Sequence, residues 1–179
     1  MRKYLITIFF VNLLISNNIF LKFISNNDDF IKSNPKIISF LYIDNIAQDQ
    51  NFRSGKLVID KNIYKIDLDD QILMVSDNIL KKYNYKTNQI FIENSFPVVD
   101  SIFFNFFNDK FLKMIDKNKS DYSLNFSFNL DSTSITEING KYQNYNFTIY
   151  NIEFIYQNID SSAVFSFDYP DAFIFDLRD

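Results

Sequence analysis

Apolar and polar residues alternate along most of the chain with a period of two, which predicts strands that bury one face. The longest uninterrupted example is YSLNFSFNL at residues 122–130. The spacers between the shorter runs are two to five residues rich in Asp, Asn, Lys and Thr, the length of hairpin loops. The sequence therefore predicts a meander, one continuous antiparallel sheet. Its shorter strands are expected at residues 37–43, 55–60, 63–68, 71–76, 79–84 and 89–93.

The dipeptide Asn139-Gly140 marks an expected hairpin in the second half of the chain. Both residue types tolerate the left-handed backbone of a type I′ turn, so we expect a strand at residues 133–138 joined to one that begins at Lys141. A last strand is expected at residues 163–167.

The arm that follows Lys141 changes its pattern part-way along. Its apolar residues keep one parity up to Ile149 and the other from Ile152. One extra residue in a strand shifts the parity in this way, so we expect a bulge or a second turn at Asn151.

A short helix is predicted near residues 27–34, before the first strand. Asp28 and Asp29 suit the positive N-terminal end of a helix, and Pro35 cannot continue one.

A second helix is predicted at about residues 97–115. Apolar residues recur there at spacings of three and four, Pro97 suits an early helical position, and Ser95 is a candidate cap. The apolar arc is wider than one contact needs. An ordinary amphipathic helix packed on the sheet accounts for the pattern, and so does a lid over an apolar cavity. The residues alone leave both interpretations open.

Residues 1–25 have the layout of a secretory signal. Arg2 and Lys3 precede the apolar run YLITIFFVNLLI, and polar residues follow it. The run is about half the ~20 apolar residues that a spanning helix needs, which makes a membrane anchor the less favoured alternative. We therefore expect an exported protein whose single domain occupies residues 26–179.

The composition excludes several classes of site. The chain has no Cys and no His, which removes disulfides, thiolate or imidazole metal sites and the common nucleophile pairs. Only two Gly are present, too few for a phosphate-binding loop. The formal net charge is −4 and no basic run exists, so a nucleic acid is not an expected partner. With 47% hydrophobic residues, 22 of them Phe, the chain can bury a core.

Carboxylates are the remaining candidates for chemistry. Asp28-Asp29, Asp69-Asp70 and Glu137 lie in expected turns and strands, as solvated side chains do. We expect no catalytic residue, no metal, no cofactor and no enzyme activity.

Several short motifs, taken in order, resemble the periplasmic outer-membrane lipoprotein carrier family (LolA-like proteins). Gly55-x-Leu57 opens an apolar strand, and Ser76-Asp77 precedes a strand that ends in Tyr-Asn. The C-terminal FSFDYPDAFIFDLRD resembles the family's F-x-F-x-x-P…D ending. The resemblance covers nearly the whole chain from Asn27, although each motif is short.

The resemblance implies a mainly β fold with a helical lid, an unclosed antiparallel half-barrel covered by helices. It implies a non-enzymatic, monomeric periplasmic carrier that shields the acyl chains of lipoproteins in an apolar cavity and moves them from the inner to the outer membrane. The implied partners are those acyl chains, an inner-membrane lipoprotein-releasing transporter and an outer-membrane acceptor. By strand parity, the expected lining of the cavity is Leu57, Ile59, Tyr64, Ile66, Leu73, Val75, Phe126 and Phe128, with Phe103, Phe106, Phe107 and Phe111 from the lid.

One departure from the family concerns the latch of the lid. The better-known members carry an Arg-Pro pair after the strand that matches Gly55–Ile59, where this chain has Lys61-Asn62. The latch role is not transferred to Lys61. Two other interpretations stay open: an envelope interaction or structural module without cargo, and an outer-membrane β-barrel.

Overall fold

The computed structural model of the protein describes residues 19, 21–33, 35–44, 52–105, 122–142, 145–155 and 164–178. Helical segments are residues 21–26, α2 (Asp28–Lys32) and α3 (Pro97–Phe104). The strands are β1 (Lys36–Asp44), β2 (Phe52–Asp60), β3 (Ile63–Leu68), β4 (Gln71–Ser76), β5 (Ile79–Asn84), β6 (Gln89–Asn94), β7 (Tyr122–Phe128), β8 (Ile135–Tyr142), β9 (Tyr145–Ile155) and β10 (Phe173–Asp176).

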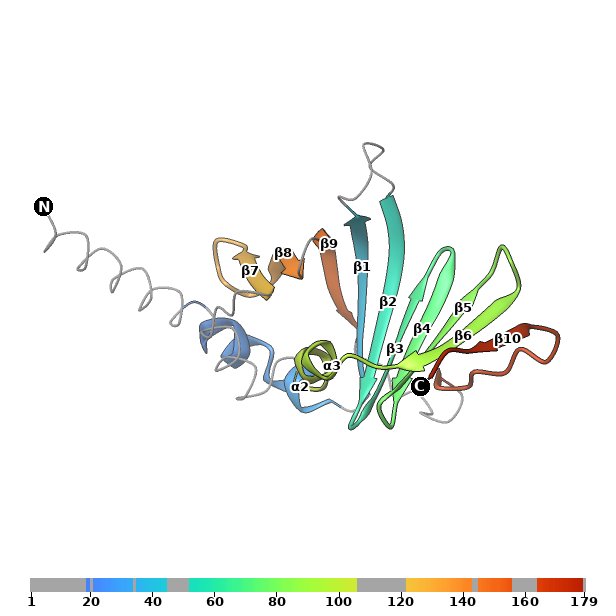
Figure 1. Cartoon of the computed structure of the whole chain (residues 1–179). Helices are drawn as coiled ribbons and strands as arrows, with labels where there is room; N and C mark the ends of the chain where they lie inside the picture. Colours follow the sequence, from blue (N-terminus) through green and yellow to red (C-terminus); the bar gives the residue numbers. More distant parts are fainter. Residues whose placement is uncertain are drawn as a thin grey trace, which may run out of the picture.

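All ten strands belong to one open sheet, in the order β10-β6-β5-β4-β3-β2-β1-β9-β8-β7 (Figure 1). Neighbouring strands are antiparallel except β10, which runs parallel to β6. The predicted strands at residues 37–93 are confirmed, and so are the short hairpins between them. Asp77 and Asn78 both have positive φ, 51° and 61°, as a type I′ turn requires.

The predicted fold class, a half-barrel under a helical lid, is wrong. The sheet is open and mixed, and the described helices are short. The helix expected at residues 97–115 is eight residues long and ends at Phe104. Asn105 follows in a turn, a conformation that Asn side chains favour over a helix interior. The remainder of the expected lid lies outside the described residues.

The hairpin expected at Asn139-Gly140 is also wrong, because β8 runs straight through both residues. Gly140 has no positive φ. It lies opposite Phe147 of β9, whose ring would come within 2.0 Å of an added Cβ. The glycine therefore makes room for an aromatic ring that lies across the strand, and no turn is needed.

The bulge expected at Asn151 is confirmed. Asn151 has φ 51°, and the register of β9 against β1 shifts between Ser39 and Leu41. The strand continues through the bulge to Ile155, so that Ile149 and Ile152 both face the same side of the sheet as Phe40.

The strand expected at residues 163–167 is not found at 164–167. The carbonyl oxygens of Val164 and Ser166 accept hydrogen bonds from the Lys65 ammonium, at 3.1 and 3.4 Å, instead of from a neighbouring strand. Farther along, Tyr169 stacks on Tyr83 with ring centroids 3.8 Å apart. This segment covers the side of the sheet that we call the convex face, and the last strand is β10.

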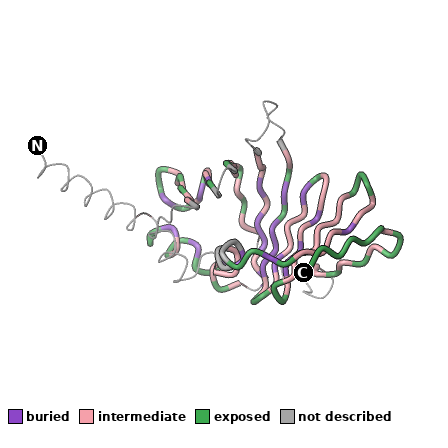
Figure 2. The backbone as a smooth tube through the Cα atoms, viewed as in Figure 1, coloured by how far each residue is buried: buried purple, intermediate pink, exposed green. Residues whose placement is uncertain are grey.

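The other side, the concave face, packs against the helices. Phe23 and Phe30 are fully buried there. Phe23 contacts Phe128 of β7 and Phe154 of β9 at centroid distances of 5.6 and 5.7 Å, and Phe30 contacts Phe154 at 4.2 Å. Figure 2 shows the buried residues concentrated in these helices and the central strands, whereas β10 is exposed along its length. Among the described helices, none combines the length and hydropathy needed to cross a bilayer.

Candidate functional site

An apolar cavity of about 320 Å³ lies on the concave face, between the central strands and α3. Its size falls at the lower end of the roughly 300–1,000 Å³ typical of small-molecule sites. Strand alternation places its walls, since residues two apart on each strand face the same side. The lining residues are Ile38, Phe40, Tyr42, Arg53, Leu57, Ile66, Leu68, Gln71, Leu73, Phe103, Leu124, Ile138, Phe147, Ile149 and Ile152.

Curvature of the sheet is what forms this cavity. Leu73 on β4 and Leu124 on β7 line the same space, although six strand-to-strand steps separate β4 from β7. In a flat sheet these steps of about 4.8 Å would place the two strands about 29 Å apart. The sheet must therefore bend around the cavity, as its outline in Figure 1 also indicates.

The only two glycines of the chain lie opposite two aromatic residues that line the cavity. Gly55 on β2 lies opposite Phe40, and Gly140 on β8 lies opposite Phe147. A Cβ at Gly55 would come within 2.4 Å of the Phe40 ring, as one at Gly140 would with Phe147. Each glycine therefore lets a ring lie close to the neighbouring backbone. A ring held in this way lines the cavity without filling it.

A second, smaller cavity of about 160 Å³ continues the first under α3. The two cavities share Ile66, Leu73 and Phe103 as lining residues. The Phe103 ring packs on Tyr64 of β3, with centroids 4.6 Å apart, and Phe104 contacts the same tyrosine at 5.4 Å. Phe103 thus stands between two compartments of one apolar space.

The predicted lining residues are distributed unequally. Leu57, Ile66, Leu73 and Phe103 line the larger cavity, and Tyr64 and Val75 line the smaller one. Ile59 belongs to the buried core, and Phe126 and Phe128 pack against that core. The positions of Phe106, Phe107 and Phe111 lie outside the described residues.

A buried carboxylate holds α3 to the sheet. Asp100 in the first turn of α3 is 4% exposed and accepts hydrogen bonds from the Tyr64 hydroxyl at 2.9 Å and the Ser95 hydroxyl at 2.6 Å. Burial, and then the neighbouring Asp100, raise the pKa of Tyr64 well above its usual value, so this tyrosine stays protonated and donates. Ser95, expected as a helix cap, instead donates to Asp100 as part of this clamp.

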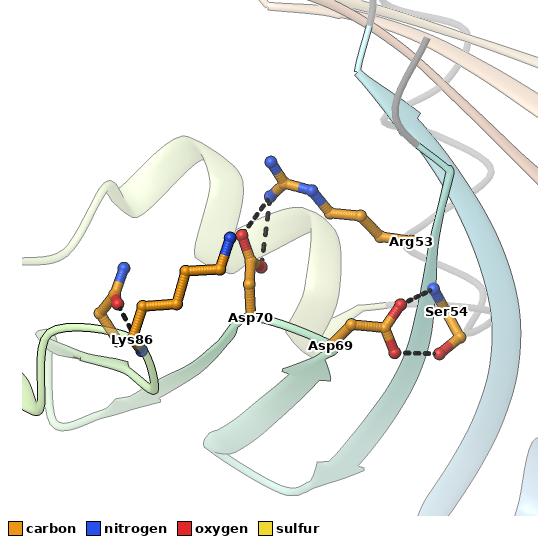
Figure 3. A network of polar contacts seen from close by, with 6 residues as sticks. Arg53, Ser54, Asp69, Asp70 and Lys86 are labelled. Atoms are coloured by element: carbon orange, nitrogen blue, oxygen red, sulfur yellow. Dashed lines mark hydrogen bonds and ion pairs between the residues drawn. The ribbon is translucent and has the colours of Figure 1, made fainter.

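Polar groups line the larger cavity at one end, where β1 ends and β2 begins. Tyr42 and Arg53 pair across these strands, and Gln71 opens β4. One guanidinium nitrogen of Arg53 lies 3.3 Å from the carboxylate of Asp70. Figure 3 shows this pair, with Asp69 turned instead toward Ser54.

Asp69 and Asp70 have different roles. The hydroxyl and the backbone N–H of Ser54 both donate to the Asp69 carboxylate and lower its pKa. Of the other carboxylates considered from the sequence, Asp28 pairs with Lys32, and Glu137 accepts from Asn139. In the part of the chain that the structure describes, no three acidic side chains gather closely enough to hold a metal ion.

A larger depression of about 490 Å³ lies on the convex face, between β2 and β3. Its walls are mostly polar and include Ser54, Lys56, Asp67 and Tyr85. It is also open to solvent, so it lacks the enclosed apolar surface of the concave cavity.

Sequence reasoning missed part of the lining. The alternation in residues 37–43 contains the signal for Ile38, Phe40 and Tyr42, and the parity of β2 that selects Leu57 also selects Arg53. No local sequence pattern predicted that Ile138 and Phe147 line the cavity, because their positions depend on β8 continuing through Gly140.

No protein-family model matches the chain. No curated protein matches it either. Among solved structures, the chain is similar to the crystal structure of an uncharacterized conserved protein from Thermus thermophilus. The identity is 9%, the match covers 90% of this chain and 98% of that chain, and the TM-score is 0.49. A likeness at this level says nothing about what this chain binds.

Proposed function

We propose that the protein is a non-enzymatic periplasmic carrier that shelters an acyl chain of a lipoprotein in the concave cavity during its passage between membranes. The observation that carries the proposal is the 320 Å³ cavity with almost wholly apolar walls. The resemblance of short motifs to those of lipoprotein carriers also supports the proposal, and Leu57 of Gly55-x-Leu57 lines that cavity.

The physical need for such a carrier is large. Each methylene group kept from water contributes about 0.8 kcal/mol, so a chain of about 15 methylenes represents about 12 kcal/mol. A binding protein of this kind needs apolar surface and no catalytic group. The partners would be the acylated cargo, a releasing transporter in the inner membrane and an acceptor in the outer membrane.

The exposed β10 favours a second candidate, an interaction or assembly module. Phe173, Ile174 and Phe175 are 70%, 63% and 42% exposed, and β10 forms an edge of the sheet. Exposed apolar edge strands are common sites of pairing with another chain.

Binding and transfer of an acylated probe test the proposal. Purified protein should bind a fluorescent fatty-acid analogue and speed the transfer of an acylated lipid between donor and acceptor vesicles. Leu73→Phe, which fills the space shared by both cavities, should lower the affinity at least about tenfold with little loss of stability. The matched control is Ile174→Phe on exposed β10, which should bind normally. Absence of binding by the wild-type protein would contradict the proposal and favour the assembly module.

A further inference from the structure

The polar end of the cavity has a composition unlike the rest of its wall. Arg53 is the sole charged residue among the fifteen that line the cavity; Tyr42 pairs with it across β1 and β2, and Gln71 of β4 is the other polar residue of the lining. The remaining walls are aliphatic or aromatic. A cavity of this form offers hydrocarbon contacts along its length and a cation with hydrogen-bond donors at one end.

Arg53 is only loosely engaged by the protein. Its contacts with Asp70 are 3.3 and 3.4 Å and involve the same nitrogen, Nη1. That geometry is longer than the 2.7–2.9 Å of a strong charge-assisted hydrogen bond and is not the paired fork of a bidentate contact. Among the described residues the Arg53 side chain has no other hydrogen-bond partner, so several of its N–H donors remain available at the cavity wall.

Asp69 and Asp70, the two acidic residues next to Arg53, differ in how strongly they would repel an anion bound there. Asp69 is held by two donors of Ser54 and belongs to the polar depression on the convex face. Asp70 faces Arg53, but Lys86 follows Tyr85, whose N–H donates to the Asp70 carbonyl oxygen at 3.1 Å. Lys86 thus adds a positive charge to the turn that is hydrogen-bonded to the backbone of Asp70.

We propose that the cavity binds a single-chain amphiphile with an anionic head group, the chain lying along the concave face and the head group accepting hydrogen bonds from Arg53. The inference rests on the proposed function for the apolar cavity and goes beyond it in the ligand, because the linked acyl chain of a lipoprotein has no anionic head group whereas a free single-chain amphiphile does. A carboxylate and a phosphate share the required chemistry, since both present oxygen atoms that match a guanidinium.

Ligands that differ only in the head group separate this proposal from the proposed function. We would measure displacement of an apolar fluorescent dye by dodecanoate, dodecyl phosphate and dodecanol at pH 8. The wild-type protein should bind at least one of the two anions about tenfold more tightly than the alcohol, the size expected for a hydrogen bond to a charged group. Comparison of the two anions identifies the head group.

Two variants test whether Arg53 causes the preference for anions over the alcohol. Arg53→Gln should abolish the preference for anions while leaving the affinity for dodecanol unchanged. Because this change leaves Asp70 without Arg53, the double variant Arg53→Gln/Asp70→Asn serves as a check on folding and should behave in the same way. The matched control is Lys56→Gln, which removes one positive charge from the exposed convex side of the same strand and should keep the preference.

The outcomes are distinct. Equal binding of anions and alcohol by the wild-type protein would overturn the head-group proposal and leave the acyl-chain carrier standing. An anion preference that survives in both Arg53 variants would also overturn it. Failure of all three compounds to bind would contradict the carrier itself.

Discussion

The concave face has two regions that differ in what covers them. In the filled region, against part of β7 and β9, the helical segment 21–26 inserts Phe23 and α2 inserts Phe30, and both rings are fully buried. Beside it lies the hollow region, a cavity of about 320 Å³ that is lined by residues of β1 to β4 and of β7 to β9, and among the described helices it is the eight-residue α3 that covers this cavity.

The difference between these regions lies in where large side chains enter the space between sheet and helix. In the filled region, aromatic rings project from a helix into the sheet. In the hollow region, the rings of Phe40 and Phe147 lie close to Gly55 and Gly140 and line the cavity. An apolar face thus becomes a core or a binding site according to a few side chains, while the backbone of the sheet is continuous across both regions.

The largest loss of stability is expected when a buried ring is removed from the filled region. Phe23→Ala removes a fully buried ring that contacts β7 and β9, and should lower the free energy of unfolding by about 3–5 kcal/mol. Chemical denaturation measures the change. The matched control is Leu21→Ala on the same helical segment, which is 52% exposed and should cost no more than about 0.5 kcal/mol. Equal losses in the two variants would show that the helical segment does not anchor the fold.

A smaller effect is expected from loosening the cover of the hollow region. Tyr64→Phe removes one of the two hydrogen bonds to the buried carboxylate of Asp100, and should destabilise the protein by about 2 kcal/mol. Tyr85→Phe, which removes an exposed 3.2 Å bond to Asp67, should change stability by at most about 0.5 kcal/mol. If Tyr64→Phe proves neutral in thermal unfolding, Asp100 does not clamp α3.

The smallest effect on stability, with a clear effect on binding, is expected from Gly140→Ala. The new methyl group would clash with the Phe147 ring, whose Cζ is the nearest atom, and would push that ring into the cavity. A ring can move more easily than backbone, so we expect a loss of about 1 kcal/mol. Binding of a fluorescent acyl probe should fall severalfold. Unchanged probe affinity, with the variant folded, would show that Phe147 does not border the occupied space.

The sheet could be predicted from the sequence, because alternation and hairpin spacing are local signals. These local signals predicted the strands of residues 37–93 and the bulge at Asn151. Part of the lining followed from the same parity, which placed Leu57, Ile66 and Leu73 on one face.

The errors arose where the surroundings outweighed a local signal. Asn139-Gly140 has the composition of a turn, yet Gly140 is needed to accommodate the Phe147 ring within a continuous strand. The length of α3 and the parallel pairing of β10 with β6 depend on contacts between distant segments. The clamp between Tyr64 and Asp100, 36 residues apart, had no signature in the local pattern.

The most direct test of the carrier is to observe which side chains respond to a bound acyl chain. Methyl NMR of the labelled protein during titration with dodecanoate should show shifts at Leu57, Ile66, Leu73 and Ile149, which line the concave cavity. Methyl groups of Val58 and Ile72, on adjacent positions of the same strands but facing the convex side, should stay unchanged. Shifts confined to the convex face or to Ile174 of β10, or no shifts at saturating ligand, would contradict the account.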